Sequence, residues 1–139
     1  MSLINNRAKA SQLIDFTGLK SGAIHPTDID AVLEFDDKFL ILIEVKTKGN
    51  NLTWGQRLVL ERIVDAWNDG EKKAIALCVS HDVRDYSKPI MLDVCEVDLF
   101  YSGDAWKEGN GKTNVKETLR GLAKIWNIKK LKDVKYEKI

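Results

Sequence analysis

A predicted β-hairpin over residues 30–46 constrains the fold of this chain more than any other segment. Residues 30–35 and 39–46 are rich in apolar and β-branched side chains, as strands are, and residues 36–38 between them are turn formers. If residues 36–38 are the loop, Phe35 faces Phe39 across the hairpin. Because the side chains of a strand alternate between its two faces, this turn fixes which residues share a face all along both strands.

The hairpin register brings charged side chains together at the ends of the two strands. Counting back from the turn places Asp30 directly opposite Glu44, and facing residues have Cβ atoms about 4.5–5.5 Å apart. Lys46 lies two residues beyond Glu44 and therefore shares its face, with Asp28 opposite. The sequence thus predicts two carboxylates and a lysine at one corner of a sheet.

The remaining segments predict one α/β domain over residues 1–139, a central mixed sheet flanked by helices. We expect the order helix, three strands, helix and strand, followed by an added strand and a C-terminal helix. The expected elements are helices over 2–16 and 53–68, strands over 20–25, 30–35, 39–46, 74–79 and 91–101, a loop over 102–113, and a last helix bearing Val115, Leu119, Leu122, Ile125 and Trp126.

Composition narrows the class of protein. The chain is 44% hydrophobic and 31% charged, as ordinary globular proteins are. Its longest apolar run, Phe39 to Ile43, is far shorter than the ~20 residues of a membrane span, and the N-terminus lacks the pattern of a secretory signal. Cys78 and Cys95 both lie in apolar runs, which indicates reduced core thiols and a cytoplasmic protein.

Charge is unevenly distributed along the chain. The formal net charge is +1, yet residues 124–139 carry six lysines against two acidic residues. We therefore expect a basic C-terminal tail at about residues 127–139, which is either a DNA-contacting segment or a solvated terminus.

The paired carboxylates predict a site for a hard divalent cation. Two carboxylates this close repel each other unless a cation or proton lies between them. Mg²⁺ takes one or two carboxylates and fills its other positions with water and phosphate oxygens, and Mn²⁺ would substitute for it. Asp30, Glu44 and the backbone carbonyl of Val45 are the expected ligands, and Asp28 is either an accessory ligand or a turn residue. Lys46 would orient a water or neutralise charge on the phosphate.

Gln56 has two interpretations that the sequence leaves open. It begins the apolar stripe of the 53–68 helix and so points toward the sheet, where its amide could reach a water or a phosphate. Thr53 and Gln56 also have the spacing of a capping box, which explains both residues without catalysis.

Several basic and aromatic residues are candidates for contacts with DNA. A nucleotide cofactor is not expected, because the glycine-rich segment 109–113 has Trp106 where a phosphate-binding loop needs a glycine. The candidate DNA contacts are Lys48, Trp54, Arg57, Lys107, Lys112, Lys129 and Lys130.

Asp30, the Glu44-Val45-Lys46 triplet and Gln56 on the following helix resemble the PD-(D/E)XK nuclease superfamily, in particular its small stand-alone members such as VRR-type nucleases, RecB-like domains and Holliday-junction resolvases. The resemblance covers about residues 25–68. It implies a restriction-endonuclease-like core, with Asp30 and Glu44 as metal ligands, Lys46 as the catalytic lysine and Gln56 as the helix glutamine.

The chain departs from the superfamily pattern in two respects. The proline-aspartate pair is altered, since Pro26-Thr27-Asp28 precedes the matching Asp30. Many members also carry a glutamate on the first helix. Residues 1–33 contain no glutamate, and Asp15 is the one acidic candidate on the expected first helix.

The expected function is Mg²⁺-dependent hydrolysis of DNA phosphodiester bonds, directed by DNA structure rather than by sequence. The alternative is a catalytically inactive DNA-binding or assembly module that retains the nuclease fold. Family analogy suggests a homodimer, and no membrane partner is expected.

Overall fold

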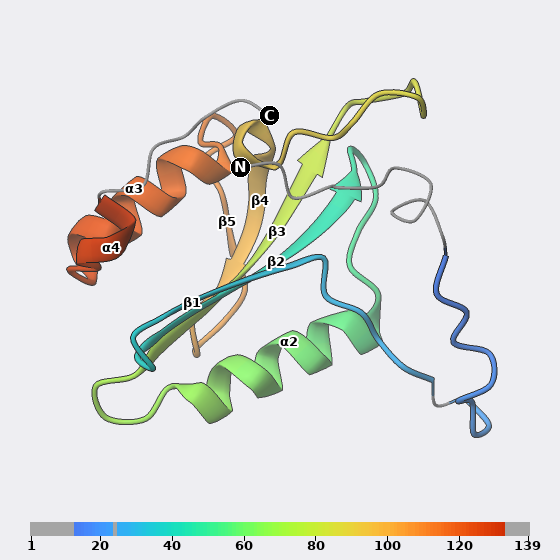
Figure 1. The fold of residues 1–139 in the computed structure, drawn as a ribbon, viewed down its shortest axis with the longest axis horizontal. Coiled ribbons are helices and arrows are strands. Elements are labelled where there is room, and N and C mark those ends of the chain that lie inside the picture. The colour runs from blue at the N-terminus through green and yellow to red at the C-terminus, as the bar shows by residue number, and fades with distance from the viewer. Residues whose placement is uncertain (1–12, 24, 133–139) are drawn as a thin grey trace. The chain divides into compact units, whose positions relative to one another are not determined.

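The computed structural model describes residues 13–23 and 25–132 (Figure 1). The chain divides into two compact units, one of Met1–Asp28 and Glu137–Ile139 and one of Ile29–Tyr136, and each is considered by itself. The helix expected over 2–16 and most of the basic tail lie largely outside the described residues. The strand expected over 20–25 is wrong, because no strand forms among its described residues and Gly22, at a φ of 60°, lies in a turn with Ala23.

The second unit is built on a mixed sheet whose strands follow one another in sequence order. Its strands are β1 (Ala31–Phe35), β2 (Phe39–Thr47), β3 (Lys73–His81), β4 (Glu96–Tyr101) and β5 (Lys107–Glu108). Strands β2 and β3 are parallel, and the other neighbours are antiparallel. Helix α2 (Trp54–Trp67) connects the parallel pair. The expected α/β class with a central mixed sheet and flanking helices is therefore confirmed.

The hairpin register is confirmed along the whole of β1. Phe35 pairs with Phe39 and Ala31 pairs with Ile43. The turn is closed by the Lys38 amide, which donates to the Phe35 carbonyl at 3.0 Å. Asp36 and Asp37 both have a φ of 56°, a left-handed conformation that aspartate tolerates better than most residues.

Helix α2 covers one face of the sheet and helices α3 and α4 cover the other (Figure 1). Leu60 and Val64 of α2 are buried in a cluster with Leu40 and Leu42 of β2 and with small residues of β3. Because the expected stripe of the 53–68 helix supplies these contacts, α2 is held directly over the two parallel strands. We refer to this side as the α2 face.

The other face is packed by η1 (Leu92–Val94), α3 (Val115–Ile125) and α4 (Lys129–Lys132). Ile125 lies on the expected last helix, and it is 78% exposed. Helix α3 ends at this point, because Asn127 adopts a φ of 55° and the Ile128 amide returns to the Ala123 carbonyl at 3.0 Å. Ile128 is buried in the core instead.

Two further boundaries differ from the expectation. The strand expected from residue 91 begins at Glu96, because Glu96 pairs with Ser80 near the end of β3 and earlier residues have no neighbouring strand. Strand β5 lies inside the expected loop and pairs with β4 through only two residues. Cys78 and Cys95 are buried free thiols, as expected. Within the described residues, no helix has the length and hydropathy needed to cross a membrane.

Candidate active site

The side chains of Glu44 and Lys46 lie on the α2 face at the carboxyl end of β2. Leu40 and Leu42 pack under α2, and the alternation of the strand places Glu44 and Lys46 on the same side. Glu44 is only 4% exposed, whereas Lys46 is half-buried. Burying a charged carboxylate to this extent costs free energy unless neighbouring polar groups or charges stabilise it.

Asp30 reaches the same strand end through its side chain. Its Oδ2 atom accepts a hydrogen bond from the backbone amide of Val45 at 2.8 Å. The paired residues of β1 and β2 end at Ala31 and Ile43. Beyond this pair, the Asp30 carboxylate accepts from the Val45 amide in place of a backbone carbonyl of β1. In an antiparallel pair, the N–H and C=O groups of one residue point to the same neighbour. The Val45 carbonyl therefore faces the same edge as the Asp30 carboxylate.

Strand β3 continues this site across the sheet. Glu44 is in register with Cys78, and Lys46 is in register with Ser80. Burial, together with the negative charges of Asp98 and Glu44, raises the pKa of the Cys78 thiol to about 11. The positive charges of Lys46 and Arg57 oppose this increase. These four groups form a cluster of charges close enough to the buried thiol to change its pKa.

Asp98 is a member of this cluster that the sequence analysis missed. Leu99 pairs with Cys78 and Val97 pairs with Val79, so Asp98 is the extra residue of a β-bulge in β4. The Gly109 amide donates to the Asp98 carbonyl at 2.8 Å and holds the bulge against the chain after β5. The only sequence signal is an acidic residue between two apolar ones, which is also typical of an exposed strand position.

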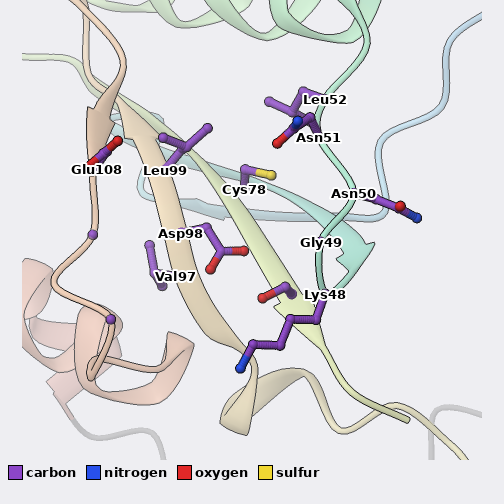
Figure 2. A pocket seen from close by; sticks show the side chains of 13 residues that line it. Lys48, Gly49, Asn50, Asn51, Leu52, Cys78, Val97, Asp98, Leu99 and Glu108 are labelled. Carbon is purple, nitrogen blue, oxygen red and sulfur yellow. The ribbon is translucent and has the colours of Figure 1, made fainter. Parts of the chain in front are cut away.

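A cavity of about 340 Å³ lies beside the strand ends on this face (Figure 2). The loop over residues 48–52 forms one wall, and β4 with the start of the 109–111 loop forms the other. Figure 2 shows the Asp98 carboxylate pointing across the hollow toward the 48–52 loop. Within that loop Asn51 turns inward and Asn50 turns away from the cavity.

Gln56 forms the capping box that the sequence allowed. Its side-chain oxygen accepts from the Thr53 amide at 3.1 Å, and the Thr53 hydroxyl oxygen accepts from the Gln56 amide at 3.2 Å. The side-chain oxygen of Gln56 is therefore used in the cap. A catalytic role, which stays a prediction, would depend on the side-chain NH₂ group.

The candidate DNA contacts lie in three places: near the strand ends, around β5, and on α4. Near the strand ends, Trp54 is 79% exposed, Lys48 lines the cavity, and Arg57 lies 5.6 Å from the ring centre of Trp106. Lys107 and Lys112 are exposed, in β5 and the loop after it.

Lys129 and Lys130 belong to α4, away from this site. Lys130 pairs with Asp36 at 2.6 Å, and this contact raises the pKa of the lysine. Asp36 lies in the turn before β2, so the pair is at the opposite end of that strand from Glu44. The structure does not bring Lys130 to the carboxylates.

The residues at the end of β2 carry oxygen donors of the kind that bind a hard divalent cation. Asp30 and Glu44 supply carboxylates and Val45 supplies a carbonyl, which is the donor set that Mg²⁺ prefers. In the part of the chain that the structure describes, no three acidic, histidine or cysteine side chains come together as a metal site. Mg²⁺ needs only one or two carboxylates, since water and substrate fill its other positions. Asp28 belongs to the first unit, so its role as an accessory ligand stays a prediction.

No protein-family model, curated protein or solved structure matches the chain.

Proposed function

We propose that this chain is a metal-dependent nuclease of the PD-(D/E)XK type that hydrolyses phosphodiester bonds in DNA. The observation that carries the proposal is the hydrogen bond from the Val45 amide to Asp30. It ties one carboxylate to the strand end where Glu44 and Lys46 share the α2 face. This bond supports the expectation that Asp30 acts together with Glu44 and Lys46.

The residues of the cluster have distinct roles in this proposal. Asp30, Glu44 and the Val45 carbonyl would hold Mg²⁺, which lowers the pKa of a bound water and offsets charge on the phosphate. Lys46 lies two residues beyond Glu44, and its ammonium group would donate to a phosphate oxygen or to the attacking water. Because Lys46 is half-buried, its charge is less screened by solvent than that of an exposed lysine.

The start of α2 would assist in binding the phosphate. Its first turn contains no acidic residue, so the partial positive charge at this helix end is not neutralised. The side-chain NH₂ of Gln56 would add a hydrogen-bond donor. Lys48 and Arg57 would contact neighbouring phosphates, and the exposed ring of Trp54 would stack on a base.

The proposed substrate is DNA with unpaired or branched structure rather than a fixed sequence, and a homodimer is proposed by family analogy. An inactive module with the same fold remains the rival proposal, supported by the lack of glutamate in residues 1–33. The two proposals differ in whether DNA is cut.

A cleavage assay on linear, nicked, flapped and four-way DNA tests the proposal. The wild type should cut at least one of these in Mg²⁺ or Mn²⁺, and Lys46→Ala should reduce cleavage at least about a hundredfold. Lys73→Ala is the matched control, because Lys73 is an exposed lysine at the other end of β3. A wild type that binds DNA and leaves every substrate intact would support the inactive module. Equal activity of wild type and Lys46→Ala would contradict the proposed role of the lysine.

A further inference from the structure

The cavity beside the strand ends contains polar groups whose hydrogen bonds are not satisfied within the described residues. Ser80 is 5% exposed and lines the cavity, yet residues 13–23 and 25–132 offer its hydroxyl no hydrogen bond. The Asp98 carboxylate likewise forms no hydrogen bond or ion pair with these residues. Because buried polar groups are normally satisfied, the Ser80 hydroxyl points to a bound polar partner. The Asp98 carboxylate is half-buried and lines the same cavity.

The charges of the cavity restrict the chemistry of that partner. An ionised carboxylate only accepts hydrogen bonds, so Asp98 and Glu108 on the β4–β5 wall favour N–H donors and disfavour anions. The opposite wall carries the amide of Asn51, and Lys48 extends its side chain from that wall across the hollow toward β4 (Figure 2). A molecule with N–H donors at one end and a phosphate at the other would match both walls.

The size and place of the cavity are compatible with one nucleobase. Its volume of about 340 Å³ is at the lower end of the range for small-molecule sites, roughly 300–1,000 Å³. Ser80, on its floor, is in register with Lys46, so the cavity adjoins the proposed phosphate position. The bond from the Gly109 amide to the Asp98 carbonyl fixes the bulge, and the acceptor is therefore already positioned in the free protein.

We propose that this cavity receives a single unpaired base that bears an exocyclic amine, next to the phosphate held at Lys46. The inference rests on the proposed nuclease function and specifies its substrate. Cytosine, adenine and guanine each present an amine to the Asp98 carboxylate. Thymine has no amine, and its one ring N–H lies between two carbonyl oxygens that would face the carboxylate. Unpaired thymine is therefore the disfavoured base.

The test measures binding in EDTA, where no cleavage can occur. The ligands are two fluorescein-labelled oligonucleotides of abasic nucleotides with one central base, cytosine in one and thymine in the other. Fluorescence anisotropy at low salt should give about tenfold tighter binding of the cytosine oligonucleotide to the wild type. Asp98→Asn should lose this preference, because an amide both donates and accepts. Asp69→Asn, an exposed aspartate at the far end of α2, should keep it.

The outcomes separate this inference from the nuclease proposal. A wild type that prefers cytosine and cuts no DNA would support the base site and contradict the nuclease alone. Equal binding of both oligonucleotides, no binding of either, or an unchanged preference in Asp98→Asn would overturn the base site. Circular dichroism and thermal unfolding check that Asp98→Asn is folded, and Ser80→Ala should weaken cytosine binding without altering the bulge.

Discussion

Two substitutions can separate a structural role of Asp30, which is its bond to the Val45 amide, from its proposed catalytic role. Asp30→Ala removes the acceptor of the Val45 amide, whereas Asp30→Asn keeps a side-chain oxygen that can accept the same bond. A hydrogen bond to a charged group contributes about 1.5–3 kcal/mol, but Asp30 is exposed and water can replace it in part. We therefore expect Asp30→Ala to lower the free energy of unfolding by about 1 kcal/mol, or roughly 3–5 °C in Tm.

Asp30→Asn should differ from Asp30→Ala in stability but not in activity. The asparagine variant should unfold within ~0.5 kcal/mol of wild type, since the bond to Val45 is retained. Both variants should lose at least about a hundredfold in cleavage rate, because neither has the charge that would hold Mg²⁺. Urea denaturation measures the first quantity, and initial rates on the best DNA substrate measure the second. Asp104→Asn, in an exposed loop, is the control for loss of one negative charge.

Metal binding gives a readout that does not depend on catalysis. If Mg²⁺ binds with a Kd of about 1 mM, 10 mM Mg²⁺ should stabilise the wild type by about 1.4 kcal/mol. This stabilisation should vanish in both Asp30 variants and persist in Asp104→Asn. Wild-type cleavage by Asp30→Asn would refute the reasoning, because Asp30 would then be needed only as an acceptor for the Val45 amide.

Three further predictions concern packing and ionisation. Leu60→Ala should destabilise the protein by about 2–5 kcal/mol in urea denaturation, since Leu60 is 1% exposed under α2. Gly109→Ala should cost about 1–3 kcal/mol or more, because its Cβ would overlap the Val97 carbonyl, whereas Gly55→Ala meets no atom and should not destabilise. The pKa of Cys78 is raised from about 9 to about 11, so the stability it contributes below pH 9 should be lost as pH rises toward 11. Iodoacetamide at pH 8 should accordingly modify this thiol far more slowly in the folded than in the urea-unfolded protein.

The half of the site formed by the hairpin could be predicted because short-range sequence determines it. The turn at residues 36–38 fixes the register, and the register fixes which face Glu44 and Lys46 share. The cap formed by Thr53 and Gln56 is equally local. In each case the interacting residues are separated by only a few positions or by one turn. The spacing of these residues in the sequence is therefore enough to predict the contact.

The bond that ties Asp30 to the site was not predictable in the same way. Strict register places Asp30 opposite Glu44, yet its carboxylate binds the amide of Val45. The reason is that β1 pairing ends at Ala31, one residue before the predicted pair could form. Where a strand ends depends on the chain that precedes it, which the pattern of the hairpin does not contain.

The cavity depends on contacts that no local pattern describes. Asp98 joins the site only because a bulge shifts the register between β3 and β4, and that bulge is held by the amide of Gly109 beyond a loop. The sequence around Gly109 predicted only a loop, whereas the close approach to Val97 requires a residue without a side chain there. The carboxylates of the proposed active site and the proposed base site thus have different structural origins. A substitution in the 109–111 loop should therefore change which base is bound while leaving the Asp30 and Glu44 corner intact.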